Sequence, residues 1–389
     1  MKERIPVNPE VLKWARETAG LDVEEVVRKI DRKRIDASTI MAWEDGKDSP
    51  SYPQLERMAY EIYKRPLALF FFPKPPQEQT PRQSFRTLPD ETIEQLPQQM
   101  RFLIRKARVM QVNLAELYDN VNPASKQIIK DLSYDSGVSP TSMAASVRKY
   151  LGTDLSTQCS WKDNDEAFKA WRSILEEHGI FVFKEAFHSD LFSGFCLYDD
   201  KFPIIFVNNS KPKTRQIFTL FHELAHLLFH NGGIDMPLEE YFIYFEDESQ
   251  RIEVLCNRFT GEFLVPGHDF NRRIAGIRIN DASLQTLADT YHVSREVILR
   301  KLLDRNMVDQ RFYAKKVAEW MQSERKKGEG RGNYYSNMGV YLSTRYMETA
   351  FSHFYQKRIS VEQLADYLGV KVKNIPGMER IMFDRGALT

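Results

Sequence analysis

The chain has 389 residues, a formal net charge of +1 and 42% hydrophobic residues. This length suffices for two or three domains with buried cores, and the near-neutral charge gives no global reason to expect nucleic acid or a membrane surface as partner. Three widely spaced cysteines exclude a disulfide framework. The N-terminal segment lacks the apolar core of a secretory signal, and the apolar run LALFFF is too short to span a bilayer. We therefore expect a cytoplasmic protein that does not enter membranes.

Residues 8–72 are predicted to form a compact set of short helices. Asn8 followed by proline is typical of a helix start, and Gly20 is typical of a helix end. Two further helices are expected to begin at the capping residues Asp22 and Asp36. Five prolines within residues 73–89 then indicate an extended linker.

The central part of the chain changes from a helical pattern to a strand pattern. Residues 90–150 have helical periodicity. Residues 179–185, 193–200 and 203–209 are β-branched and aromatic runs separated by turn residues, which predicts a small sheet. The expected fold class is therefore α+β and mostly helical. We further expect residues 193–200 to form an edge strand that can hold an extended substrate peptide by main-chain pairing.

The stretch FTLFHELAHLLFH, residues 218–230, places polar side chains at helical spacing in an apolar run. His222 and His226 lie one turn apart on a helix, so both imidazoles can reach one ion at roughly 2.0–2.1 Å. Glu223 then stands where the general base of an HExxH zinc peptidase is found. A pair of core histidines bonded to backbone carbonyls is the alternative.

A second helical run supplies candidate partners for this motif. Glu253 and Asn257 share one helical face, and we expect Glu253 to be the third ligand. Asn257 is expected to orient a ligating histidine from behind. His230 continues the four-residue series but lies too far along for a ligand. It is a candidate for binding an oxyanion or holding the acidic insertion of residues 237–250, or equally a plain helix-end histidine near its own last carbonyls.

Residues 165–305 resemble the ImmA/IrrE family of metallopeptidase-like proteins. The similarity lies in GFCLYDDKFPIIFVNNSKPKTRQIFTLFHELAHLLFH followed by EVLCNRFTGEFLVP. It implies a zincin-like unit, in which a small antiparallel sheet precedes the HExxH helix. It also implies Zn²⁺ bound by His222, His226 and Glu253, with Glu223 as the catalytic base. Cys256 stands where the family usually has alanine.

Residues 1–75 resemble the Xre type of helix-turn-helix, a module found in many proteins of that family. Operator DNA is a possible partner on this resemblance. However, the expected recognition helix offers only small polar side chains to base edges. A solvated loop or a dimerisation module is the alternative, and a homodimer is a possible assembly. The residues proposed to contact DNA are Arg32, Lys33 and Arg34 for phosphates, and Ser38 and Thr39 for bases.

The sequence thus predicts four segments and two competing functions. The segments are 1–75 (helix-turn-helix), 76–164 (linker and helical region), 165–305 (zinc peptidase-like) and 306–389 (C-terminal helical module). The first function is a zinc metallopeptidase that cleaves a regulatory protein such as a repressor. The second is an antitoxin or transcriptional repressor that sequesters a partner such as a nuclease toxin, with a structural or vestigial metal site.

Overall fold

A computed structural model gives the fold of two compact units. It describes residues 7–30, 35–78, 96–187, 189, 191–230, 232–235, 248–324 and 341–386. The first unit comprises residues 1–84 and 88–106, and the second comprises residues 85–87 and 107–389. The second unit therefore contains most of three of the segments predicted from the sequence, whose boundaries remain predictions.

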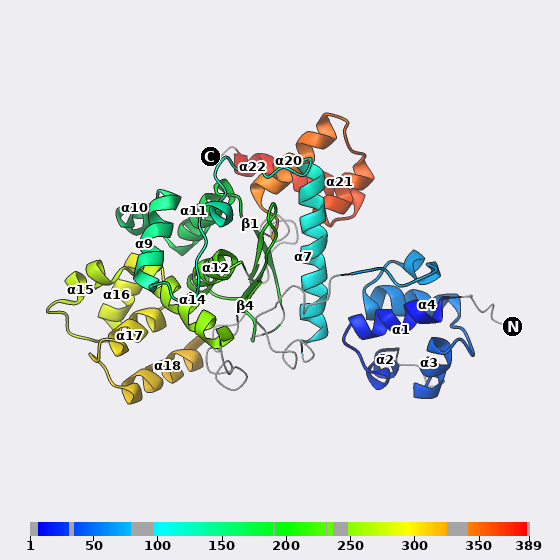
Figure 1. Ribbon diagram of the computed structural model, residues 1–389, viewed down its shortest axis with the longest axis horizontal. Coiled ribbons are helices and arrows are strands. Elements are labelled where there is room, and N and C mark those ends of the chain that lie inside the picture. Colours follow the sequence, from blue (N-terminus) through cyan, green and yellow to red (C-terminus); the bar gives the residue numbers. More distant parts are fainter. Residues whose placement is uncertain are drawn as a thin grey trace. The chain divides into compact units, whose positions relative to one another are not determined.

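The first unit is helical, and its helices begin where the sequence predicts. The Asn8 side chain accepts a hydrogen bond from the Glu10 amide, and the Asp36 side chain accepts one from the Thr39 amide. The buried faces share one core that includes Leu12, Val26 and Trp43. Its elements are α1 (Pro9–Thr18), α2 (Val23–Ile30), α3 (Ala37–Glu44), α4 (Tyr52–Arg57), the π-helical turn η1 (Met58–Tyr63), the 3-10 turn η2 (Leu67–Phe71) and the first half of α7 (Gln98–Leu117) (Figure 1).

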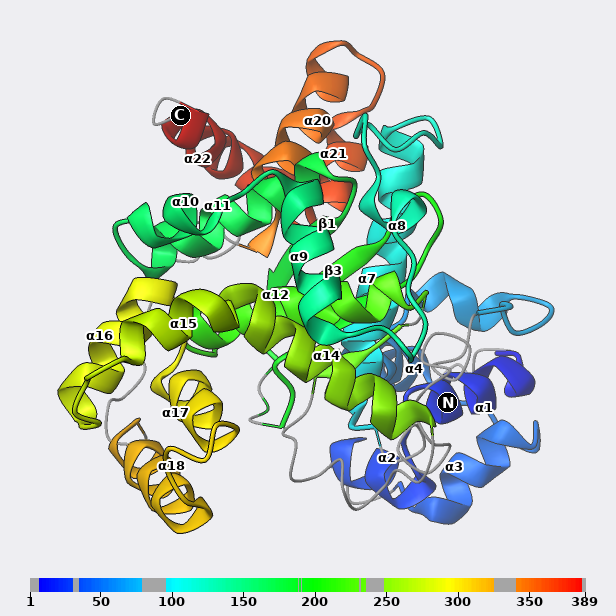
Figure 2. The ribbon, with the colours of Figure 1, turned by 60° about the vertical axis from the view of Figure 1, so that its left-hand side comes forward.

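The second unit combines a small sheet with many helices, as the α+β prediction requires (Figures 1 and 2). The helices before the sheet are α8 (Ile128–Asp131), α9 (Pro140–Leu151), α10 (Leu155–Ser160) and α11 (Asn164–Glu177). The strands are β1 (Phe181–Glu185), β2 (Gly194–Leu197), β3 (Ile204–Asn208) and β4 (Ile234–Asp235). The remaining elements are α12 (Lys213–Leu228), α14 (Glu248–Leu264), α15 (Gly267–Ile274), α16 (Asp281–Tyr291), α17 (Arg295–Leu303), α18 (Gln310–Glu324), α20 (Thr344–Tyr355), α21 (Val361–Leu368), η3 (Val372–Asn374) and α22 (Ile375–Gly386).

The sheet has the order β1-β3-β2-β4 and is mixed. β2 is antiparallel to both β3 and β4, but β1 is parallel to β3. The prediction of a wholly antiparallel sheet is therefore wrong, because the connection after β1 passes the end of β3 before β2 begins. The predicted edge position of residues 193–200 is also wrong over Gly194 and Phe195, where β4 pairs with β2.

The two faces of the sheet are covered by different helices (Figure 1). Val182, Ile205 and Val207 share a core with α11 and α12. On the opposite face, Phe183 meets Tyr346 of α20 edge-on, with ring centroids 5.4 Å apart. Tyr118, just after α7, packs against Phe181 on that same face. The C-terminal helices are thus part of the body that supports the sheet.

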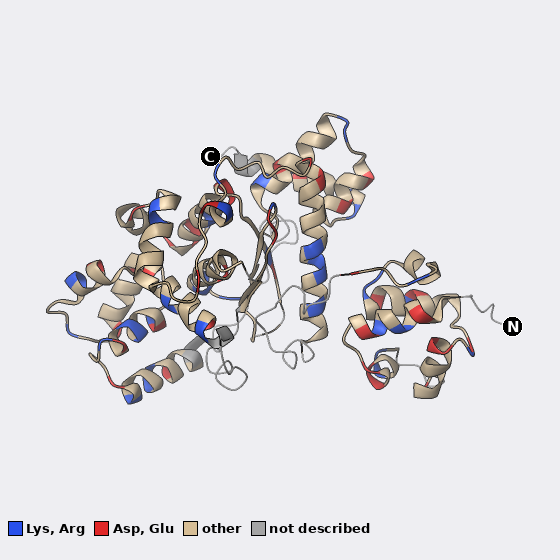
Figure 3. Ribbon diagram, viewed as in Figure 1, with Lys and Arg blue, Asp and Glu red and all other residues tan. Residues whose placement is uncertain are grey.

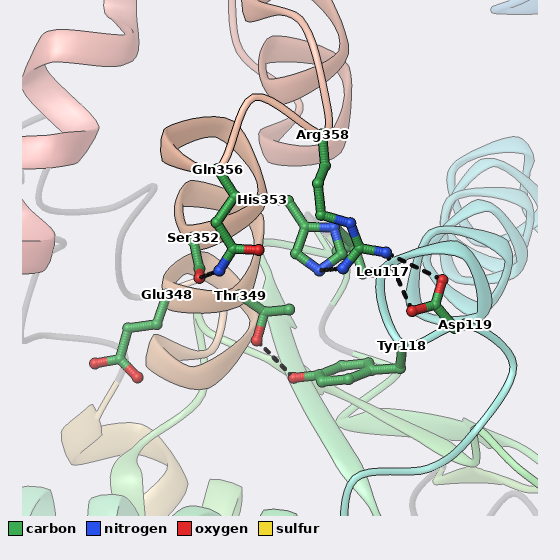
Figure 4. A pocket seen from close by; sticks show the side chains of 9 residues that line it. All are labelled: Leu117, Tyr118, Asp119, Glu348, Thr349, Ser352, His353, Gln356 and Arg358. Atoms are coloured by element: carbon green, nitrogen blue, oxygen red, sulfur yellow. Dashed lines mark hydrogen bonds and ion pairs between the residues drawn. The ribbon is translucent and has the colours of Figure 1, made fainter.

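Polar contacts fasten the end of α7 to α20 around a pocket of about 500 Å³ (Figure 4). The Tyr118 hydroxyl and the Thr349 hydroxyl lie 2.8 Å apart. Arg358 donates to both carboxylate oxygens of Asp119, at 3.1 and 3.2 Å.

Among the described helices, none has the length and apolar character needed to cross a bilayer.

Candidate metal centre

Helix α12 carries the HExxH residues through the middle of the second unit. It packs against α11, α14 and β2, so it is buried on all sides over its last three turns. His222, Glu223 and His226 are all 0% exposed. Polar groups at this depth require partners, because an unpaired buried polar group costs several kcal/mol.

The partner comes from α14, which runs alongside α12. The Nε2 atoms of His222 and His226 lie 3.2 Å apart. Glu253 places one carboxylate oxygen 3.3 Å from His222 Nε2 and the other 3.1 Å from His226 Nε2. The structure therefore brings together the three residues predicted as ligands, and they form a group able to hold a metal ion.

The donor set and its spacing fit a tetrahedral ion. Bonds of roughly 2.0–2.1 Å to a tetrahedral centre place neighbouring ligand atoms about 3.3 Å apart. The 3.2 Å between the two Nε2 atoms is close to that edge length, and Glu253 places a different carboxylate oxygen 3.1–3.3 Å from each of them. Two imidazoles and one carboxylate are also the ligand set of many catalytic zinc sites, in which a fourth position is left for water.

The charge states of Glu253 and His226 depend on each other. Burial opposes ionisation of Glu253, but the neighbouring charge of His226 and hydrogen bonds with both imidazoles lower the pKa of Glu253 to about 2. Burial lowers the pKa of His226, but Cys256 and Glu253 together raise it well above its ordinary value. The metal-free cluster therefore holds a proton that a metal must displace.

Two of the three cysteines lie beside this cluster. Burial raises the pKa of Cys256, next to His226, to about 11. Burial and the nearby Glu223 carboxylate raise the pKa of the Cys196 thiol, on β2, well above its ordinary value. Motif reading missed Cys196, because β2 is 26 residues before His222 and only pairing of the strands brings it to the site.

Two further residues predicted for this site have local partners. The Asn257 side chain donates to the carbonyl oxygen of Glu253, at 2.9 Å, so it braces the ligand's backbone instead of a histidine. His230 follows α12 in the left-handed conformation with φ +57°. One nitrogen of its ring lies 3.3 Å from the Ile129 carbonyl oxygen. This carbonyl belongs to α8 and not to the end of α12, and His230 is not one of the three residues grouped as a candidate metal site.

The residues proposed to contact DNA lie in the first unit. Arg32, Lys33 and Arg34 fall outside the described residues. Ser38 and Thr39 both donate their hydroxyls to Asp36 Oδ1, at 2.8 Å each. Helix α3 itself has no Lys or Arg (Figure 3).

Comparison with known families supports the central segment alone. Residues 175–303 match the IrrE N-terminal-like domain, a peptidase family. The match contains α12 and α14 and thus all three residues of the candidate metal site. No curated protein matches the chain closely enough to suggest a substrate or partner. The helix-turn-helix assignment for residues 1–75 remains a prediction.

Proposed function

We propose that the second unit is a zinc-dependent peptidase that hydrolyses a specific regulatory protein. The observation that carries this proposal is the convergence of His222, His226 and Glu253 with an intact Glu223 between the two histidines. When bound, zinc acts as a Lewis acid on a scissile carbonyl and lowers the pKa of water.

The residues of the chain have separate tasks in this reaction. His222 and His226 hold the ion through Nε2, and Glu253 holds it through its carboxylate. Glu223 is outside the group of candidate ligands, and its carboxylate would take a proton from the attacking water and return it to the leaving amine. Burial of these groups excludes bulk water, which strengthens the electrostatic interactions among them.

Glu223→Gln tests the proposal because it removes the base and keeps the shape. The variant should retain zinc and fold, and it should cut its partner about 10²–10⁴ times more slowly. Pull-down with the variant should therefore trap a protein that the wild type cleaves. Glu362→Gln, at an exposed glutamate on α21, is the matched control and should behave as wild type.

The opposite result would favour the binding regulator. If wild type and Glu223→Gln retain the same partner, leave it uncut and repress or neutralise it equally in cells, the peptidase proposal fails. The chain would then act as an antitoxin or repressor with a structural metal site. A nuclease partner or operator DNA would be the target to examine first.

A further inference from the structure

A glycine lies directly against the second histidine of the motif. A Cβ built on Gly233 would come within 2.5 Å of the Cγ and Cδ2 atoms of His226, and within 2.9 Å of its Nδ1. Real Cβ atoms do not approach that closely, so only glycine fits. The backbone at residue 233 therefore forms one wall of the space occupied by the His226 ring.

Cys196 holds this glycine from the neighbouring strand. The Cys196 amide donates to the Gly233 carbonyl oxygen at 2.9 Å. The Gly233 amide donates to Cys196 Sγ at 3.2 Å. In a regular antiparallel pair this second bond would go to a backbone carbonyl. The thiol lies in the core shared with α12, so a bond to sulfur draws Gly233 towards the helix that carries His226.

The same cysteine also lies near the proposed base. Burial and the nearby carboxylate of Glu223 raise the pKa of the Cys196 thiol well above its ordinary value. The residue that holds Gly233 is therefore also a neighbour of the residue proposed to move the proton.

A second glycine allows β2 to approach α12. A Cβ on Gly194 would lie 2.3 Å from Thr219 Cγ2 and 2.7 Å from the Phe206 carbonyl oxygen. Thr219 precedes His222 by less than one turn. Gly194 therefore sets the separation of strand and helix, but it does not touch the histidine rings.

We infer that Cys196 and Gly233 are positioning residues of the metal centre, which fix the ring of His226. This inference rests on the proposed metal-binding function. Gly233 limits rotation of the imidazole about its Cβ–Cγ bond. Cys196 keeps Gly233 in place through two hydrogen bonds. Partners behind the ligands of this kind typically contribute 10- to 100-fold in metal affinity or activity.

The test measures metal binding by the full-length protein, independently of cleavage. Zn²⁺ affinity is obtained by competition with a chromophoric chelator, and ligand geometry from the visible spectrum of the Co²⁺ form. Cys196→Ala removes the thiol, Cys196→Ser replaces it with another donor and acceptor, and Gly233→Ala pushes a methyl group into the His226 ring. Cys159→Ala controls for loss of a cysteine elsewhere. Gly261→Ala controls for glycine replacement, since its Cβ would meet nothing closer than 4.0 Å.

Cys196→Ala and Gly233→Ala should each weaken Zn²⁺ binding about 10- to 100-fold and change the Co²⁺ spectrum. Cys196→Ser should recover most of the affinity, and both controls should match wild type. If Gly233→Ala does not fold, the Cys196 pair decides the matter.

Wild-type affinity and spectrum in Cys196→Ala would overturn the inference while leaving the metal site intact. A lower melting temperature of the metal-free variant with an unchanged spectrum would also overturn it, because Cys196 would then only stabilise the fold. Absence of metal binding by the wild type is the separate result that would overturn the proposed function, and this inference with it.

Discussion

Helices α12 and α3 both carry polar residues that the sequence singles out, and they use them in opposite ways. α12 directs His222 and His226 towards Glu253 on a different helix. α3 directs the hydroxyls of Ser38 and Thr39 back to Asp36, its own N-cap. The first arrangement gathers ligands around one point. The second satisfies hydrogen-bond donors within one turn of the chain.

This difference distinguishes polar residues that form a ligand site from polar residues that only cap their own helix. Two imidazoles and a carboxylate from two helices converge on one point, which is the arrangement that a bound cation requires. Helix capping, in contrast, is sufficient to account for polar residues at a helix start, because Ser, Thr and Asp there satisfy backbone amides that the helix leaves unpaired. The polar residues of α3 therefore need no ligand to account for them.

The largest effect is expected from removing a ligand of α12 or α14. His222→Ala and Glu253→Ala should each reduce zinc from about one ion per chain to a small fraction, measured by elemental analysis. Chelation should lower the melting temperature of the wild type, since metal stabilises only the folded form that binds it, and should barely affect either variant.

His230→Ala is the matched control for that experiment. His230 follows the same helix, but its ring lies near the Ile129 carbonyl oxygen and outside the ligand group. Its replacement should leave the zinc content unchanged. Full zinc content in both His222→Ala and Glu253→Ala would contradict the assignment. The polar residues of α12, like those of α3, would then be satisfied within the chain and would bind no metal.

The contrast also shows how far each part of the site was readable from sequence. His222, His226 and Glu253 were found because four-residue spacing fixes where side chains lie on a helix, whatever the rest of the fold does. Cys196 and Gly233 were not found, because they reach the site through strand pairing between segments 37 residues apart. Strand periodicity gives the face of a residue and leaves its pairing partner open.

In the fold too, local features were predictable from the sequence and long-range strand pairing was not. The starts of α1 and α3 follow from local capping by Asn8 and Asp36, and both were predicted. β4 has only two residues, too short for a periodic pattern, and its pairing with β2 decides which strand lies at the edge. The parallel pairing of β1 and β3 could not be predicted either, because the composition of an apolar run does not indicate the direction in which the strand pairs with its neighbour.

A smaller effect is expected in the protons that accompany metal binding. The raised pKa of His226 and the lowered pKa of Glu253 mean that the metal-free site holds a protonated imidazole beside a carboxylate near neutral pH. Zinc requires a neutral imidazole, so its uptake should release about one proton per ion. Calorimetry in buffers of different ionisation enthalpy measures this number. Uptake without proton release would mean that His226 is already neutral.

The same pKa shifts give the direction of the pH dependence of the metal-free fold. Glu253 has a folded pKa of about 2, below its ordinary value of 4.5. Its contribution to stability should therefore be complete above pH 4.5 and disappear as the pH falls through about 2. Glu253→Gln should lack this part of the acid transition. An identical acid transition in both proteins would show that the carboxylate is not held by the imidazoles.

The smallest effect is expected from the hydroxyls of α3. A side chain that reads a base edge well contributes about 1–3 kcal/mol of discrimination. Ser38 and Thr39 donate to Asp36 instead, so replacing both with alanine should change neither the affinity nor the sequence preference for DNA from upstream of the gene. Mobility shifts at low and moderate salt measure both quantities, since any phosphate contacts weaken with salt while base contacts set the preference.

Asp36→Ala is the companion variant, because it removes the cap and frees both hydroxyls. Loss of sequence preference in the Ser38→Ala, Thr39→Ala protein would show that the hydroxyls leave Asp36 to meet DNA. Helix α3 would then be a binding element whose partner is supplied from outside the chain, as α12 is for its metal.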